Sequence, residues 1–484
     1  MKRLSDIIKP IAWRRLLLVA IVAASAGQAF GQPASGRIYD EQLRVKLDQI
    51  DPETREKTFD AGGWFNLAIF HFDDPVARRK RNMRQYELRA WASMNFQGVH
   101  TAYVRGVAGL NDWSGGRSND SETGIERAWY QLDLGKLLQN DSGKRPPIGV
   151  KVRLGRDFMS IGTALALSTT LDMGKIEITA GDWELMGFLG HTLRDSWNLD
   201  ESVAVANRQS RWITGAEIAY RGFSQHRPFV YYMHNNDRTN PSSTAVGSIM
   251  LPNETMTNAS YEYDSDYIGA GSTGTLCVSN LRYQIEGVVE FGRTYPNNGV
   301  SGVTGRDRIQ AWAMDAAVEY VFVDCPTKPR VGFEYLYASG DSDRTSSPIS
   351  TDGGNLAGTS DGGFGGFGFR DLGIAASPEI SNIHVYVLSA SCQPLEHIEL
   401  FEKMEVGTKL FYYSRAKGSG PISDTTTRTN ANATGFEMDF FCNWRVTSDL
   451  AWTVRYGSFF PGAAYDGGDK SPRQFLYSGL VFSF

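Results

Sequence analysis

Basic side chains recur on the polar side of several segments in which polar and apolar residues alternate. Guanidinium groups present forked donors that match carboxylates, and the lysine ammonium group adds a point charge. A row of such groups would hold an anion weakly and pass it from one residue to the next. The alternative is that these charges only pair with carboxylates and keep a polar surface hydrated. The candidates are Arg89, Arg105, Arg127, Lys151 and Arg153 from four consecutive segments, and Arg455 from the segment before the last.

Carboxylates predominate on the polar sides of later segments, where Arg282 and Lys403 are basic exceptions. If all the polar sides face one interior, a basic wall lies opposite an acidic wall. Such an arrangement would suit an anionic solute that must be held without being trapped. The acidic candidates are Glu286, Glu290, Asp315, Glu319, Glu334, Glu437 and Asp439.

The segments that carry these residues have the period-two pattern of β-strands and are bounded by clusters of Gly, Asn, Asp or Pro. Eighteen such segments lie between residues 62 and 484. Charged residues occupy one side of each, and an Arg or Lys facing lipid near mid-membrane costs about 2–4 kcal/mol. The charged side must therefore face a lumen. The sequence predicts an all-β fold, a single transmembrane antiparallel β-barrel of about 18 strands.

The connections between these segments alternate between short and long. Turns such as 97–98, 271–274 and 446–447 are brief, whereas 237–258 and 341–381 are long. Short periplasmic turns and long extracellular loops are typical of bacterial barrels. A soluble β-sandwich would also show alternating strands, but it would not account for this asymmetry.

The two ends of the sequence predict where in the cell the protein is located. Residues 1–31 combine basic residues, an apolar run and small residues, which is typical of a secretory signal peptide. The apolar run is shorter than the ~20 residues that cross a bilayer, which disfavours the alternative of a membrane anchor. The last segment ends on Phe484, and a terminal strand of this kind is what the barrel assembly machinery recognises. We expect a signal peptide at 1–31, a periplasmic segment at 32–61, and a barrel at 62–484 in the cell outer membrane, in contact with its lipid.

Composition narrows the function further. The net charge of −5 becomes more negative without the basic signal peptide, which argues against nucleic acid as a partner. The cysteines have neither CxxC nor paired-histidine spacing, so no metal site or cofactor is expected. We expect free thiols, with a bridge between Cys277 and Cys325 as the alternative. An enzyme is disfavoured because none of the seven histidines combines with Ser and Asp in a recognisable catalytic pattern.

Four motifs resemble the alginate export family, whose members are outer-membrane barrels that release the acidic polysaccharide alginate. The resemblance implies diffusive export of an anionic polymer, and it implies that Arg127, Arg156 and Arg455 contact that polymer. The alternative is a general or anion-preferring porin for small anions and other small solutes. The motifs are residues 125–130 (IERAWY), 154–162 (LGRDFMSIG), 335–341 (YLYASGD) and 459–465 (FFPGAAY).

An export pore must not leak small solutes, so the lumen needs an occluding loop. The periplasmic turns are short, and the best extracellular candidate is 353–373, which is rich in glycine and aromatic residues. Its aromatic faces could stack on sugar rings. The alternative is an unstructured surface loop. The candidate gate residues are Phe364, Phe367, Phe369 and Arg370.

Overall fold

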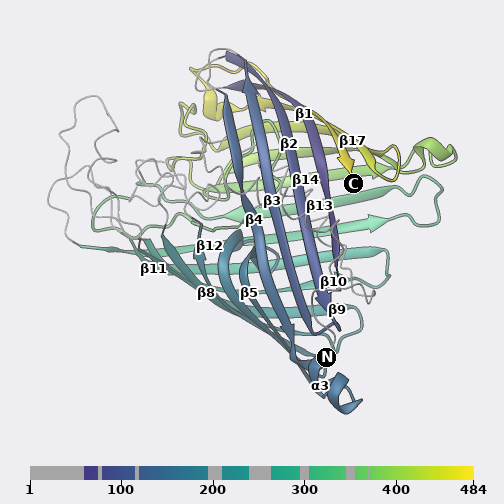
Figure 1. Ribbon diagram of the computed structural model, residues 1–484. Coiled ribbons are helices and arrows are strands. Elements are labelled where there is room, and N and C mark those ends of the chain that lie inside the picture. The colour runs from purple at the N-terminus through teal and green to yellow at the C-terminus, as the bar shows by residue number, and fades with distance from the viewer. Residues whose placement is uncertain are drawn as a thin grey trace.

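The computed structural model describes residues 59–74, 79–114, 119–193, 210–238, 263–294, 305–344, 355–368 and 370–484. These residues form one antiparallel sheet of 18 strands that closes into a barrel (Figure 1). The predicted fold class and strand number are thus confirmed. The predicted signal peptide at 1–31 and almost all of the segment at 32–61 lie outside the described residues.

Each strand pairs with its neighbours in chain order, and β1 closes the barrel against β18. The strands are β1 (Asp60–Asp74), β2 (Arg79–Phe96), β3 (His100–Trp113), β4 (Asp120–Asp133), β5 (Ile148–Ile161), β6 (Leu167–Ala180), β7 (Trp183–Thr192), β8 (Arg211–Tyr220), β9 (His226–Asp237), β10 (Tyr263–Thr275), β11 (Leu281–Thr294), β12 (Asp307–Val321), β13 (Arg330–Ala338), β14 (Ile383–Cys392), β15 (Met404–Arg415), β16 (Ala433–Arg445), β17 (Leu450–Pro461) and β18 (Arg473–Ser483).

The closing seam between β1 and β18 uses the last residue of the sequence. Cα partners run from Trp64 opposite Ser483 to Phe72 opposite Phe475. The backbone N–H of Gly63 donates to Phe484 O at 3.0 Å, and that of Phe484 donates to Gly63 O at 2.9 Å. The terminal residue therefore takes part in the ladder, which removes the open edge that a final strand would otherwise present.

Alternation separates an outer face from an inner one. On β11 the outward side chains of Ile285 and Val289 are 46% and 50% exposed, whereas Glu286 and Glu290 on the other face are at most 2% exposed. Outward apolar side chains suit contact with lipid tails. The charged face lies inside, as the sequence predicted.

Short turns lie at one end of the barrel and long connections at the other. A helix, α3 (Leu134–Ser142), interrupts the short end between β4 and β5 and projects beyond the strands in Figure 1. Asp133 caps its start by accepting a hydrogen bond from the N–H of Lys136, and Gly143 ends it in the left-handed conformation. The alternation of polar and apolar residues gave no indication of this helix. Two 3₁₀ turns, η2 (Glu399–Phe401) and η3 (Ala463–Tyr465), lie in other connections.

The turn expected at 271–274 lies elsewhere. These residues belong to β10, and the chain turns at 276–280, where Cys277 has a φ of 60°. A Cβ on Gly271 would overlap the carbonyl of Ile285, and one on Gly274 would overlap that of Gln225. Both glycines are needed for the close approach of neighbouring backbone.

All four cysteines are free. The alternative of a disulfide bridge between Cys277 and Cys325 is therefore wrong, and both residues are exposed.

Among the described residues, no helix is long and apolar enough to cross a bilayer.

Candidate functional site

The lumen brings most of the predicted basic residues together, but their exposure differs. Arg89 and Arg105 point inward and are only 1% exposed each. Their Nε atoms donate to Oε2 of Glu126 at 3.0 and 2.9 Å, and Arg89 also pairs with Glu87. Both guanidinium groups also lie over the ring of Trp64. The structure therefore builds these two arginines into the wall, not into the surface that a solute would reach.

Arg127, Lys151 and Arg153 form a partly exposed basic cluster on β4 and β5. Nη1 of Arg153 donates to Asp157 Oδ2 at 2.5 Å, and Nη1 of Arg127 lies 3.5 Å from the other oxygen of that carboxylate. The Arg153 guanidinium also rests over Trp129, 4.1 Å from the ring centroid. The side chains of Arg127 and Arg153 are 13% and 24% exposed. These groups are held in fixed positions while part of each still faces the lumen.

Arg156 does not line the lumen. Alternation along β5 puts Arg153 and Asp157 on the inner face, and puts Arg156 on the outer face with Leu154. Arg156 Nε donates to Asp172 Oδ1 at 2.8 Å, and its Nη2 to Oδ2 at 3.0 Å, so the pair is bidentate. This result corrects the placement of Arg156 among the pore-lining residues.

Arg455 on β17 faces the lumen beside the closing seam. Its Nη2 donates to Asn443 Oδ1 at 3.1 Å, and its guanidinium lies 5.0 Å from the centroid of the Phe441 ring. The side chain is partly exposed. With the cluster on β4 and β5, it places cations on both sides of the seam.

The picture of one basic wall facing one acidic wall needs correction. Carboxylates such as Asp157 stand among the arginines, and three lumen cations lie on strands outside the predicted wall. Lys175 on β6 pairs with Glu177, Arg227 on β9 with Glu184 and Glu217, and Lys409 on β15 with Asp371. Each lies on the polar side of its strand, so alternation carried the signal that would have found it.

The long connection between β13 and β14 folds into the barrel. Phe364 and Phe367 are 0% and 1% exposed and belong to one apolar cluster with lumen side chains of β5 to β15 and of β17. Ile374 packs against Phe70 and Phe475 at the seam. This segment, residues 355–376, therefore crosses the lumen, and we name it the crossing loop. Phe369, the remaining aromatic gate candidate, lies outside the described residues.

Carboxylates of the predicted acidic wall anchor the crossing loop. The backbone N–H of Gly365 donates to Glu290 Oε2 at 2.7 Å, and the Tyr263 hydroxyl donates to Oε1 at 2.5 Å; the Tyr267 hydroxyl oxygen lies 3.0 Å from the same Oε1. Glu290 is thereby satisfied inside the barrel, as a buried charge requires. It is 2% exposed, so it serves the loop and not a passing solute.

Glu437 makes a second anchor at the other end of the crossing loop. Its two oxygens accept the backbone N–H groups of Ile374, Ala375 and Ala376 at 2.6, 2.7 and 2.8 Å. The Tyr413 hydroxyl donates to the same carboxylate at 3.1 Å. Because backbone groups make these contacts, no side chain of the loop signals them in the sequence.

Between the two anchors, adjacent loop residues of opposite charge pair with opposite charges on the wall. Arg370 Nη2 donates to Asp315 Oδ2 on β12 at 2.7 Å, and Lys409 Nζ on β15 donates to Asp371 Oδ2 at 2.6 Å. This alternation of sign fixes which loop residue meets which strand. Arg370 also reaches the Thr163 hydroxyl at 2.5 Å, which joins the crossing loop to the short connection between β5 and β6.

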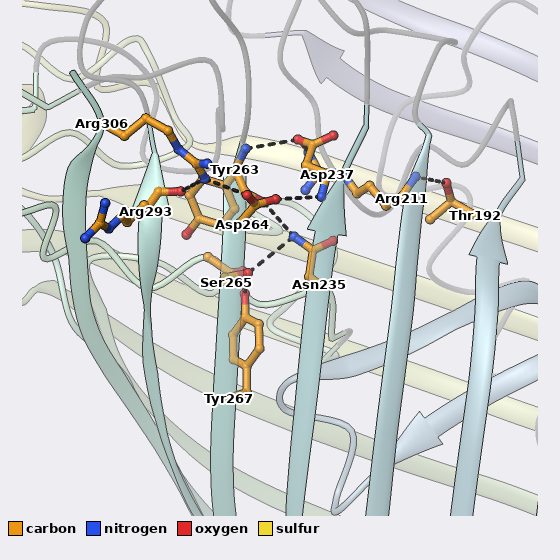
Figure 2. A network of polar contacts seen from close by, with 11 residues as sticks. Thr192, Arg211, Asn235, Asp237, Tyr263, Asp264, Ser265, Tyr267, Arg293 and Arg306 are labelled. Carbon is orange, nitrogen blue, oxygen red and sulfur yellow. Dashed lines mark hydrogen bonds and ion pairs between the residues drawn. The ribbon is translucent and has the colours of Figure 1, made fainter. Parts of the chain in front are cut away.

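A buried polar network stabilises the wall next to the first anchor (Figure 2). Arg211 Nη2 lies 3.1 Å from Asp237 Oδ2, and Asn235 Nδ2 donates to the Tyr263 carbonyl at 2.8 Å. The Arg211 guanidinium sits 5.3 Å from the Phe367 ring centroid, and the Tyr267 hydroxyl donates to Gly365 O at 2.6 Å. The wall and the loop thus form one packed unit, which overturns the alternative of an unstructured surface loop.

The alginate export family model matches residues 171–477, which is more than half of the chain. The chain belongs to the alginate export family. The match begins within β6, ends within β18, and includes the crossing loop and Arg455. It begins after the cluster of Arg127, Lys151 and Arg153.

Solved structures with the same fold are outer-membrane porins. The chain is similar to Acinetobacter baumannii OccAB1 at 11% identity, with 90% of this chain and 99% of that chain covered and a TM-score of 0.52. Pseudomonas aeruginosa OccK8 (OprE) gives 10% identity, 88% and 98% coverage and a TM-score of 0.50. A comparison with curated protein sequences gives no significant match. Family and fold together place this member of the alginate export family in the outer membrane as a pore.

Two of the motifs that suggested the family lie inside the matched region, and each has a structural role. In YLYASGD, Asp341 Oδ2 accepts the N–H of Gly362 at 2.8 Å, and a Cβ on Gly340 would overlap the Asn382 side chain. In FFPGAAY, the Tyr465 hydroxyl donates to Asp424 Oδ2 at 2.8 Å. Burial raises the pKa of Asp424, but pairing with Arg473 and hydrogen bonds from Thr426 outweigh burial and hold it below its usual range. These motifs position extracellular connections.

Proposed function

We propose that the protein is an outer-membrane pore for diffusive export of an anionic polysaccharide such as alginate. The observation that carries this proposal is the set of partly exposed cations on both sides of the seam. Lys151 and Arg153 lie on one side and Arg455 on the other. Of the described residues of the crossing loop, Ile374 and Ala375 reach the seam, where they pack against Phe70 and Phe475. Lys151, Arg153 and Arg455 stay partly exposed beside that contact, so we propose that the solute passes along the seam side of the lumen.

The contacts of these cations suit transport better than tight binding. Arg153 already shares Asp157 and Gln131, so a uronate carboxylate would compete with existing partners and bind weakly at each point. Conduction needs binding that is weak and distributed over several sites. Guanidinium forks match carboxylate geometry, which favours a polyuronate over a neutral sugar chain.

Planar-bilayer conductance tests this proposal. We expect a short oligouronate to block the current of the purified barrel, and the block to weaken about tenfold in the double variant Lys151→Gln/Arg153→Gln. Arg156→Gln is the matched control, because Arg156 lies on the same strand but faces outward. A current that does not change when oligouronate is added would refute the proposed cargo.

The alternative function is an anion-preferring porin for small solutes. The observation in its favour is that the lumen cations stand among carboxylates, as Arg227 does with Glu184 and Glu217, so the lining has mixed charge. This reading predicts a reversal potential that favours chloride but no block by oligouronate. The same bilayer experiment separates the two functions.

We further propose that the domain boundaries follow the sequence pattern, with a signal peptide at 1–31, a periplasmic segment at 32–61 and the barrel from 62. The pairing of Phe484 with Gly63 supports recognition of the last strand by the barrel assembly machinery, since that strand must join the seam. Deleting Phe484 should reduce insertion into the outer membrane. Insertion at the wild-type level would contradict this role.

A further inference from the structure

Two arginines face each other on the outer surface of the barrel. Arg293 on β11 and Arg308 on β12 are directly opposite Cα partners in the ladder. Alternation puts both on the outer face, because Val288 and Glu290 on β11, and Ile309 on β12, are buried on the inner face. Both side chains are exposed. Like charges at directly opposite positions of a sheet destabilise it.

The neighbouring carboxylate does not neutralise this pair. Asp264 on β10 is directly opposite Arg293 in the ladder, but its carboxylate pairs with another arginine. Arg306 Nη2 donates to Asp264 Oδ2 at 2.7 Å. Arg306 also donates to the Arg293 carbonyl at 2.8 Å, and Figure 2 shows the Arg293 guanidinium apart from these contacts. In the part of the chain that the structure describes, the side chains of Arg293 and Arg308 have no hydrogen-bond or ion-pair partner.

The pair lies where the apolar belt ends. The next outward residue along β11 is Phe291, and two outward steps from Arg308 along β12 is Trp312; these rings are 41% and 46% exposed. Arg293 and Arg308 are near the ends of their strands that lead into the long connection between β11 and β12, which is the extracellular end. The guanidinium groups are therefore at the level of lipid headgroups in the outer leaflet.

We propose that Arg293 and Arg308, with Arg306 beside them, bind a phosphate group of an outer-leaflet glycolipid. An anion between the two guanidinium groups would turn their repulsion into a bridge. Arg293 and Arg308 bring together two positive charges that no carboxylate of the described residues pairs with, and guanidinium forks match phosphate oxygens. The adjoining Phe291 and Trp312 would contact the acyl chains, so a lipid fits this site better than free phosphate.

Native mass spectrometry of the detergent-purified barrel, titrated with diphosphorylated lipid A, tests the site. We expect the double variant Arg293→Gln/Arg308→Gln to lose at least about tenfold in affinity. The matched control is Arg84→Gln/Arg156→Gln, which also removes two outward arginines, but ones paired with Asp112 and Asp172. Unchanged lipid affinity in the first variant, or an equal loss in the control, would overturn the proposal.

Two further experiments separate lipid binding from phosphate binding and from a loss of folding. Inorganic phosphate alone should bind far more weakly than lipid A and should not displace it; equal binding would mean that the site takes free phosphate and not a lipid. Arg293→Glu places opposite charges across the ladder, so it should fold at least as well as the wild type without lipid and yet not be stabilised by lipid A in thermal unfolding. Stabilisation of this variant equal to that of the wild type would contradict the phosphate bridge.

Discussion

The loop side and the seam side of the lumen use the same kinds of charged residues for different purposes. On the loop side, Glu290 and Glu437 are buried and accept backbone N–H groups of the crossing loop. On the seam side, Lys151, Arg153 and Arg455 stay partly exposed. A charge on the lumen wall therefore indicates a solute path only where no loop covers it. Burial separates anchors from lining residues, and alternation alone does not.

The largest expected effect comes from removing an anchor. Glu437→Ala would leave one buried and two partly buried backbone N–H groups without this acceptor, and the loss at a buried group costs about 1–3 kcal/mol. The far end of the crossing loop should then leave the wall, and single-channel conductance should rise severalfold. Glu319→Gln is the control, since that carboxylate faces the lumen but is 42% exposed and pairs only loosely with Arg282. Wild-type conductance in Glu437→Ala would show that the loop is held by other contacts.

The next effect separates wall arginines from lining arginines. Arg89→Gln leaves Glu87 and Glu126 buried with less compensation, so it should destabilise the barrel by about 3–5 kcal/mol. Chemical unfolding in detergent would measure this loss. The folded variant should keep the wild-type reversal potential in a salt gradient. Arg153→Gln should lose little stability but reduce the preference for anions. A change of selectivity in Arg89→Gln alone would contradict the distinction between wall arginines and lining arginines.

A smaller effect is expected where opposite charges fix the position of the crossing loop. Asp315→Arg should repel Arg370 and raise the open-channel noise and conductance by about twofold. Combining it with Arg370→Asp restores a pair of opposite charge in reversed order. The double variant should therefore return toward wild-type behaviour. Equal conductance in the single and double variants would indicate that this ion pair does not position the loop.

The smallest effect concerns pH outside the membrane. Because the pKa of Asp424 is held below its usual value, its contact with Arg473 stabilises the folded extracellular connections above the unfolded pKa of about 4 and is lost as pH falls through the folded value. Hydrogen exchange of residues 424–429 should thus be similar at pH 7 and 5, after correction for the intrinsic exchange rate, and rise only in stronger acid. Asp424→Asn should remove this acid dependence. Faster hydrogen exchange of these residues already at pH 5 in the wild type would contradict a lowered pKa of Asp424.

The fold was predictable because each strand carries its own signal. Alternation and connection lengths gave the number of strands, and the terminal Phe484 indicated the closing strand. The glycines at 271–274 misled because they permit close backbone approach within β10, a requirement that depends on neighbouring strands and not on the local sequence. The helix α3 was missed because its capping by Asp133 and Gly143 occupies a single short connection.

The candidate site was predictable only in part. Alternation placed Arg153 and Arg455 correctly toward the lumen, but Arg156 had been carried over from a motif, and the phase of β5 turns it outward. The glycine and aromatic pattern around Phe364 and Phe367 did indicate a special loop. Its inward path could not be predicted, because distant carboxylates such as Glu437 bind its backbone and leave no trace in its side chains.

The central claim, that an anionic polymer passes along the seam side, is tested most directly by comparing oligouronate block in two lumen variants. Lys151→Gln/Arg153→Gln removes partly exposed cations on the seam side. Arg227→Gln removes a lumen cation on β9, whose side chain is 33% exposed and pairs with Glu184 and Glu217. We predict about tenfold weaker block in the first variant and little change in the second. Equal block in both variants and the wild type, or a loss confined to Arg227→Gln, would contradict the account.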